Sequence, residues 1–247
     1  MKKFDAIIIG FGKGGKTLAS ALVKQGMTVA IIERSSSMYG GTCINIACIP
    51  MKSLVEQAEK SVNYAKAISK KDDLTAFLRE KNFNNLDQKD GITFLTGEAS
   101  FVSPHEVKVE LESETVTLSA EYIFINTGAE SVIPREDRDI AEAIQQTLEK
   151  KGIQFKLNVK VKTVEGSLVA YEDGDGEHKI EADAVLLATG RKPYTEGLNL
   201  EAAGVNITDR GTVQVDETLR TNVPHIWAIG DVNGGPQFTY ISIDKIL

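Results

Sequence analysis

The feature that most constrains the fold is a glycine-rich loop near the N-terminus, set between an apolar run and a helix-like stretch. The apolar run Ala6–Ile9 leads into Gly10-Phe-Gly12-Lys-Gly-Gly15, which fits the pattern G-x-G-x-x-G. An Ala/Leu-rich periodic stretch, Thr17–Lys24, and a second apolar run, Val29–Ile32, follow. This order predicts a strand–helix–strand unit over residues 4–34 and an α/β fold of the Rossmann type.

The same loop predicts a nucleotide site. Gly10 permits a tight turn, Gly12 lets the backbone approach a pyrophosphate, and Gly15 lets helix and strand pack closely. The helix N-terminus would offer free N–H groups to the phosphates. Glu33 ends the second strand, where a carboxylate can accept hydrogen bonds from a ribose. Together these residues favour an adenine dinucleotide, the alternative being that the glycines only punctuate a strand–helix turn.

The remaining elements follow from periodicity. The Lys/Glu/Ala composition of residues 53–82 predicts a helix, and short alternating runs between Ile92 and Leu118 predict antiparallel strands. Apolar residues from Tyr122 to Asn126 predict a further strand that stops at Thr127-Gly128. The other expected elements are a helix at 139–150, strands near 153–171, a turn at 172–177, and strands at 184–188, 213–215 and 226–229.

Composition limits the function classes. The chain has 247 residues, of which 42% are apolar and 26% charged, which is typical of a globular protein with one or two cores. The net charge of −7 and the scattered basic residues argue against nucleic acid as a partner. The N-terminal apolar run is too short for a signal peptide or a membrane span, so we expect a cytoplasmic protein without a membrane partner.

Two cysteines lie five positions apart in Gly40-Gly-Thr-Cys43-Ile-Asn-Ile-Ala-Cys48-Ile-Pro-Met-Lys52. In a reducing compartment such a pair is more typical of a working redox couple than of a structural disulfide. The segment resembles the signature of the class I pyridine nucleotide–disulfide oxidoreductases, which include glutathione reductase, dihydrolipoamide dehydrogenase and mercuric reductase. Inert core cysteines are the alternative interpretation.

The resemblance implies roles for this segment. Cys43 would be the interchange thiol that attacks substrate, and Cys48 the charge-transfer thiol next to the flavin of FAD. Gly41 and Thr42 would also bind the cofactor, and Lys52 would lie near N5 of the flavin. A helix N-terminus favours the thiolate, which is the reactive form. Two positions depart from the family pattern, because Ala47 replaces a usual Gly and Met51 a usual Ser or Thr, and the methyl group of Ala47 bears on disulfide geometry.

Further motifs extend the resemblance over the whole chain. Gly97-Glu-Ala99 resembles the strand that passes the adenine, and residues 188–205 resemble the link returning from a pyridine-nucleotide domain. Thr221–Asp231 resembles a second flavin motif, whose aspartate accepts a hydrogen bond from the ribityl chain, although Asp231 could also be an ordinary turn residue. The cofactor-binding residues implied by these motifs are Ala99, Thr127, Gly128, Ala129, Gly230, Asp231 and Thr239.

Comparison with the family pattern also predicts missing segments. A second G-x-G-x-x-G unit for NAD(P)H is expected between Pro134 and Arg135, and a C-terminal dimerisation domain after Leu247. We therefore expect an FAD-binding domain built from residues 1–134 and 191–247, and a remnant of the NAD(P)H-binding domain at 135–190. None of the three histidines lies in a motif that would replace the family's catalytic base.

The implied function is an FAD-dependent oxidoreductase. Electrons would pass from NAD(P)H through FAD to a Cys43–Cys48 disulfide and on to an external acceptor, which is a small molecule or a metal ion. The loop and cysteine segments resemble most the branch linked to reactive-chlorine and metal-ion resistance, and intact members are homodimers. The alternatives are a non-catalytic FAD-binding fragment, which would not turn over with NAD(P)H, and a monooxygenase-like flavoprotein.

Overall fold

The chain is described by a computed structural model that covers residues 1–128, 146, 149–157, 159–183, 185 and 192–235. It forms two compact units, one of Met1–Glu130 with Lys192–Leu247 and the other of Ser131–Arg191. Several expectations fall outside the described residues: Ala129, Thr239, the Pro134/Arg135 junction, nearly all of the 184–188 strand and most of the 139–150 helix.

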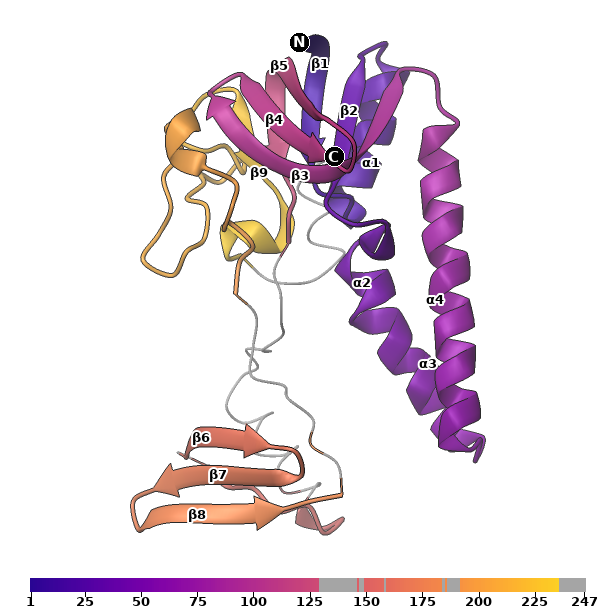
Figure 1. Cartoon of the computed structure of the whole chain (residues 1–247), viewed down its shortest axis with the longest axis vertical. Helices are drawn as coiled ribbons and strands as arrows, with labels where there is room; N and C mark the ends of the chain where they lie inside the picture. The colour runs from indigo at the N-terminus through magenta and orange to yellow at the C-terminus, as the bar shows by residue number, and fades with distance from the viewer. Residues whose placement is uncertain (129–145, 147–148, 158, 184, 186–191, 236–247) are drawn as a thin grey trace. The chain divides into compact units, whose positions relative to one another are not determined.

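A parallel sheet forms the centre of the first unit (Figure 1). Strands β1 (Lys2–Ile9) and β2 (Val29–Glu33) pair in parallel, and β2 pairs with the first half of β3 (Ile92–Ser103). On its other side β1 pairs with the second half of β5 (Thr115–Ile125), which pairs with β9 (Ile226–Ala228). The order β3-β2-β1-β5-β9 is the doubly wound arrangement predicted by the glycine loop.

The second half of β3, β4 (Glu106–Leu111) and the first half of β5 form an antiparallel meander. The predicted α/β class with a parallel sheet and a meander is confirmed. Two strand expectations were wrong in detail. Residues 122–125 continue β5 instead of forming a separate strand, and residues 213–215 contribute only a single bridge, between Val213 and Ile207.

Helices connect the parallel strands. The helix α1 (Lys13–Lys24) joins β1 to β2, and η1 (Ser36–Met38), α2 (Thr42–Asn45), α3 (Cys48–Glu59) and α4 (Tyr64–Asp87) lie between β2 and β3. The single helix expected at 53–82 is therefore two helices, which lie side by side in Figure 1. Ser61 breaks the run with φ of 53°, and the side chain of Asn63 caps α4 by accepting a hydrogen bond from Lys66 N.

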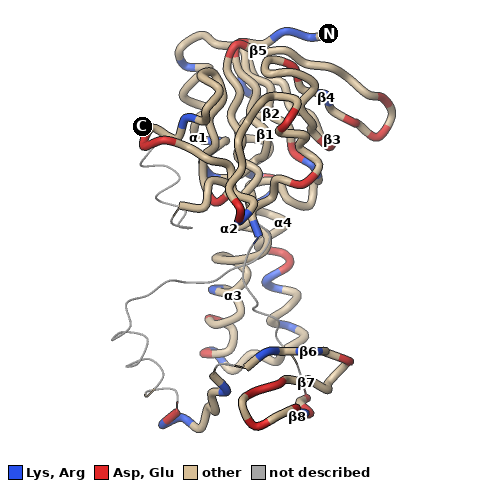
Figure 2. The backbone as a smooth tube through the Cα atoms, turned by 90° about the vertical axis from the view of Figure 1, so that its left-hand side faces the viewer, with Lys and Arg blue, Asp and Glu red and all other residues tan. Residues whose placement is uncertain are grey.

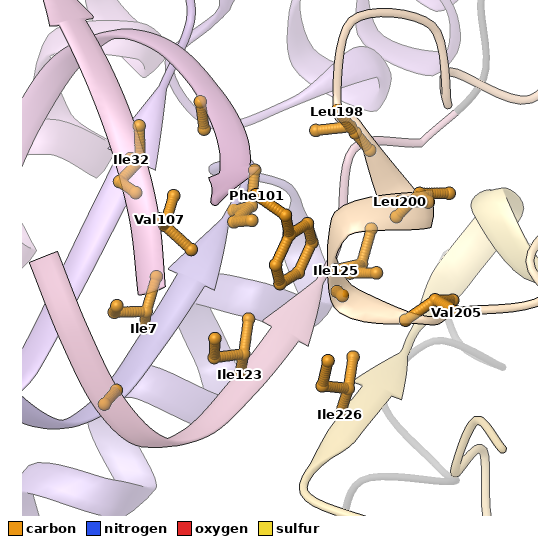
Figure 3. Packing of buried hydrophobic residues seen from close by; sticks show 14 of the residues in the cluster. Ile7, Ile32, Phe101, Val107, Ile123, Ile125, Leu198, Leu200, Val205 and Ile226 are labelled. Atoms are coloured by element: carbon orange, nitrogen blue, oxygen red, sulfur yellow. The ribbon is translucent and has the colours of Figure 1, made fainter. Parts of the chain in front are cut away.

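The core of the first unit lies on both faces of the sheet, because alternate strand residues point to opposite sides. One face carries Ile7, Ile32 and Ile125 and packs against Phe101 of the meander and against Leu200 (Figure 3). Leu200 begins η2 (Leu200–Ala203), in the segment that follows the second unit. The other face packs against α1 through Ile8, Ile31 and Leu18. This double burial explains why β1 and β2 are continuous apolar runs.

The described part of the second unit is a small antiparallel sheet. Its strands are β6 (Lys160–Glu165), β7 (Leu168–Asp173) and β8 (Gly176–Glu181), and the predicted turn at 172–177 contains the β7–β8 hairpin. Side chains on β6 are exposed, and Ala170 and Tyr171 of β7 are buried. Across the described residues of both units, no helix is long and apolar enough to cross a membrane.

Candidate functional site

The candidate site lies at the carboxyl edge of the parallel sheet. Ile9 is in register with Ile32 on one side and with Ile125 on the other, and Ile125 is in register with Ala228. The residues that follow these strands therefore meet at one edge, and they include Gly10, Glu33, Asn126 and Gly230. In open α/β sheets this edge is where ligands bind.

The glycine loop lies tightly against the end of β5. Gly10 has φ of 105°, and a Cβ atom there would lie 2.3 Å from the carbonyl oxygen of Asn126. A Cβ atom on Gly12 or Gly15 would lie 2.9 or 2.7 Å from the side-chain amide of Asn126. Gly10 and Gly15 meet backbone atoms inside the protein, so glycine is required there, whereas a Cβ atom on Gly12 would displace the side chain of Asn126. The helix α1 begins immediately afterwards with no acidic residue in its first turn, as an anion-binding N-terminus requires.

Asn126 connects three of the strand ends through its buried side chain. Its amide is oriented by its neighbours, with the oxygen accepting hydrogen bonds from the N–H groups of Gly12 and Gly15, each at 3.1 Å. The amide nitrogen donates to the carbonyl oxygen of Ile229 at 3.3 Å. This side chain was not among the predicted site residues. The only signal for it in the sequence was a polar residue at the end of a buried strand, which needs hydrogen-bond partners.

Glu33 holds the loop from the other side. One carboxylate oxygen accepts a hydrogen bond from Phe11 N at 2.9 Å, and the other accepts one from Ser35 N at 3.3 Å. Burial raises the pKa of Glu33, and the hydrogen bonds from Phe11 and Ser35 and the charge of Arg34 oppose that rise. Glu33, the residue predicted to bind the ribose, therefore also fixes the conformation of the glycine loop.

The cysteine segment begins against the glycine loop. Gly41 has φ of 82°, and a Cβ atom there would lie 2.6 Å from Cα of Gly12. A Cβ atom on Gly128 would lie 3.7 Å from the hydroxyl oxygen of Thr42, so the turn after β5 is also adjacent. Cys43 is partly buried in α2, and Cys48 is exposed at the first position of α3. Their pairing in a disulfide stays a prediction.

A partly buried lysine, Lys16, lies next to the glycine loop on α1. The Lys16 ammonium on α1 donates a hydrogen bond to the side-chain oxygen of Asn82 on α4. Burial lowers the pKa of Lys16 to about 8, with the charge of Lys13 acting in the same direction and the charge of Cys43 opposing it. The charge of Lys16 thus interacts with Cys43, the expected interchange thiol, and a positive charge favours the thiolate. The predictions from sequence did not include Lys16.

The other predicted residues differ in where they lie. Lys52 is exposed on α3, one helical turn after Cys48 and on the same side of the helix. Thr127 donates its hydroxyl hydrogen to the carbonyl oxygen of Tyr194 at 2.6 Å, and Tyr194 N donates to Gly128 O at 3.1 Å. Gly230 and Asp231 form the start of η3 (Gly230–Asn233), directly after β9.

Ala99 is the predicted residue whose side chain lies away from this edge, because it is buried in the core between the sheet and the meander. The histidines also lie elsewhere: the rings of His105 and His225 stack on each other, and His178 contacts Asp173 in the β7–β8 hairpin. Among the described residues, no group of three or more His, Cys, Asp or Glu side chains could hold a metal ion.

A doubly wound sheet with a glycine loop, a carboxylate at the end of β2 and a cysteine pair in the adjoining helices is typical of the Rossmann-type flavoprotein oxidoreductases. The profile of the pyridine nucleotide-disulphide oxidoreductase family matches residues 4–136 and 131–245. The chain belongs to this family, whose members are NAD(P)H-dependent flavoprotein disulfide oxidoreductases.

Individual relatives agree with this assignment. The probable pyridine nucleotide-disulfide oxidoreductase RclA of Escherichia coli is 36% identical, over 99% of this chain and 69% of the relative. The dihydrolipoamide dehydrogenase of Chaetomium thermophilum is 30% identical, over 96% of this chain and 64% of the relative. A solved Cu(II) complex of the HOCl-induced flavoprotein disulfide reductase RclA from Escherichia coli superposes with a TM-score of 0.90, covering 100% of this chain and 70% of that one.

The alignments also show that this chain is shorter than its relatives. The alignment to RclA runs over 305 positions, which exceeds the 247 residues of the chain, so RclA contains residues in this region that the chain lacks. The two segments of the family profile meet at residues 131–136, where the sequence predicts the missing nucleotide-binding unit.

Proposed function

We propose that this chain binds FAD at the carboxyl edge of its parallel sheet and uses Cys43 and Cys48 as a redox pair beside the flavin. The observation that carries this proposal is the contact between Gly41 and Gly12. That contact supports the proposal that the cysteine segment and the loop expected to hold the pyrophosphate form one site. When bound, FAD would supply a carrier that accepts electrons from NAD(P)H and delivers them to a disulfide.

The chain's own residues have separable roles in this proposal. The N-terminus of α1 would hold the pyrophosphate, and Glu33 would accept a hydrogen bond from the adenosine ribose. Asp231, after β9, would accept one from the ribityl chain. Cys48 would lie next to the flavin ring, and Cys43 would attack the acceptor. Lys16 would favour the thiolate form of Cys43 by its charge.

The domain assignment is part of the same proposal. Residues 1–134 with 191–247 would be the FAD-binding domain, and residues 135–190 the remnant of an NAD(P)H-binding domain. The compact units Met1–Glu130 with Lys192–Leu247, and Ser131–Arg191, support this division. A homodimer would follow from the family.

A second candidate is a non-catalytic FAD-binding protein derived from such an enzyme. It is favoured by the alignment to RclA, which has more positions than this chain has residues, and by the family match that is split at 131–136. The two candidates share the flavin site and differ in whether NAD(P)H reduces the bound flavin.

The relatives suggest an acceptor to examine first. A solved relative is a Cu(II) complex of RclA, and a second is the Cu(II) complex of a variant in which one cysteine is replaced by serine. We propose Cu(II) as a candidate acceptor for this chain. Oxidation of the Cys43–Cys48 dithiol to a disulfide releases two protons and two electrons, which would reduce two Cu(II) ions to Cu(I).

The proposal is tested by loading the chain with FAD and titrating it anaerobically with dithionite. The wild type should take up about two electrons per flavin more than the flavin alone accepts, since the disulfide is a two-electron couple. Cys48→Ser should lose this excess. Met51→Ser, three residues along the same helix, adds the same hydroxyl group without removing a thiol. This variant should keep the excess of two electrons. Failure of folded protein to retain FAD would contradict the flavin site, and an equal electron count in wild type and Cys48→Ser would contradict the redox pair.

A further inference from the structure

An open groove of about 620 Å³ runs between α1 and α4, on the outside of the first unit. Ten residues line it, and four of them are lysines: Lys13, Lys16 and Lys24 from α1, and Lys89 just after α4. None of the ten is Asp or Glu, although the whole chain has a net charge of −7. In Figure 2, α1 accordingly carries blue segments and no red one.

The spacing along α1 explains why the charges converge. Residues three or four apart lie on one face of a helix, so Lys13, Lys16, Ser20 and Lys24 form a stripe along its length. From Lys13 to Lys24 this stripe spans roughly 16 Å. Asp87 and Asp90 flank Lys89 in the sequence but do not line the groove. A ligand lying along the stripe therefore meets cations over its whole length.

Two of these lysines donate hydrogen bonds to neutral side chains. The ammonium of Lys16 contacts the amide of Asn82, and the ammonium of Lys89 donates to the hydroxyl of Ser20 at 2.9 Å. Each ammonium has three hydrogens to donate, so these contacts leave further donors for a ligand. The hydroxyl hydrogens of Thr17 and Ser20 are used by carbonyl groups of α1. Recognition in the groove therefore depends on the lysine charges.

From this arrangement we propose that the α1–α4 groove binds a linear polyanion of the condensed-phosphate class, such as a tripolyphosphate group. Lysine ammonium groups act as point charges for phosphate oxygens, and a row of them suits a ligand whose negative charges are repeated along a line. A single orthophosphate is too short to contact both ends of the stripe, but a chain of linked phosphates can do so. The inference does not depend on the proposed flavin site.

The test is isothermal titration of the FAD-treated 247-residue chain with inorganic tripolyphosphate at low ionic strength, with orthophosphate as the short probe. FAD is included because it would compete for the N-terminus of α1. We expect tripolyphosphate to bind more tightly than orthophosphate and to weaken as salt is added, because exposed charges are screened.

Variants assign the binding to the groove. Lys24→Gln with Lys89→Gln lies far from the glycine loop and should weaken tripolyphosphate binding by about tenfold. Lys24→Gln alone, at an exposed position, should give a smaller loss. Lys150→Gln with Lys151→Gln makes the same charge change at exposed residues of the second unit and should have no effect.

Three results would overturn the inference: no tripolyphosphate binding by folded protein, equal loss in the groove and control variants, or tighter binding of a hexaglutamate peptide than of tripolyphosphate. The last result would replace the condensed phosphate by an acidic peptide segment. Because the groove variants leave the glycine loop and both cysteines unchanged, failure of this inference is distinguishable from failure of the flavin site.

Discussion

At the scale of single residues, Lys16 has the largest energetic conflict. Its ammonium is partly buried, is repelled by Lys13, and has Asn82 as its hydrogen-bonding partner. A pKa lowered from 10.5 to about 8 means that folding disfavours the charged form. Near neutral pH the protein therefore retains a charge that opposes its own stability. Such conflicts are common where a charge is needed for chemistry or binding.

The sign of this effect gives a pH prediction. Between the folded pKa of about 8 and the unfolded value of 10.5, the unfolded chain binds more protons at Lys16, so stability from this residue rises with pH and is lost as pH falls through 8. Relative to Lys16→Met, the wild type should gain about 1–2 kcal/mol in its free energy of unfolding between pH 7 and pH 9.5, a figure reduced for solvent screening. Urea unfolding of both proteins at the two pH values measures this gain. A difference that is independent of pH would contradict the lowered pKa.

Some site residues could be predicted from the sequence and others could not. The positions of Gly10, Gly12, Gly15 and Glu33 followed from the spacing of one local motif, which fixes local geometry. The roles of Asn126 and Lys16 depend on partners that are distant in sequence: Gly12 and Gly15 for Asn126, and Asn82 for Lys16. Side-chain contacts of that kind are set by the packing of several elements. One sequence taken by itself does not reveal them.

At the scale of elements, some helices and strands were predictable from the sequence and others were not. The strand–helix–strand unit was predictable because its periodicity is strong and both faces of β1 and β2 are buried. The division of the 53–82 helix into α3 and α4 was not, because the break at Ser61 is made by a non-glycine residue with positive φ in a helix-favouring composition. The length of β5 was also missed, since its two halves pair with different partners and have different periodicities.

The start of α2 offers an element-scale prediction, because its position against the glycine loop depends on Gly41. Gly41→Ala would face both a positive φ and a contact of 2.6 Å with backbone of Gly12. Gly26→Ala is a matched control, since Gly26 has φ of 84° with nothing within 4 Å of an added Cβ atom. Both variants should lose about 1–2 kcal/mol in free energy of unfolding from the positive φ.

Only Gly41→Ala should weaken FAD binding, by about tenfold or more. In this variant the added methyl group would displace the start of α2 from the glycine loop, whereas the methyl group of Gly26→Ala displaces nothing. Flavin fluorescence during titration gives the affinity, and urea unfolding gives the stability. Equal FAD affinity for the two variants would show that the Gly41–Gly12 contact does not position the flavin site.

At the scale of the whole molecule, the second unit is inserted into the first. The chain leaves the first unit after Glu130 and re-enters it at Lys192. Within the first unit and close to these two points, Thr127 and Gly128 form hydrogen bonds with Tyr194. An insertion whose two ends meet can change in length with little effect on the surrounding domain. The core and the strand-end loops of the first unit would therefore tolerate the shortened insertion that we propose.

The proposed shortening of the insertion would have a consequence for catalysis. Residues 131–191 contain no G-x-G-x-x-G sequence, and the described part of this unit is an antiparallel sheet without a strand–glycine loop–helix unit. Nicotinamide must be held against the flavin for electron transfer, and such positioning contributes many orders of magnitude to a rate. A nucleotide that lacks a site for its pyrophosphate is not held in this way.

We therefore predict that NADPH and NADH do not reduce FAD bound to this chain on the time scale of turnover, although dithionite does. The measurement is anaerobic stopped-flow mixing of FAD-loaded protein with excess of each nucleotide, with the loss of flavin absorbance as the signal. Dithionite reduction of the same sample is the control for a competent flavin, because it needs no nucleotide site. Slow bleaching at the rate given by free FAD under the same conditions is the expected result. Bleaching within seconds at micromolar NADPH would contradict the prediction and favour the complete oxidoreductase over the non-catalytic FAD-binding protein.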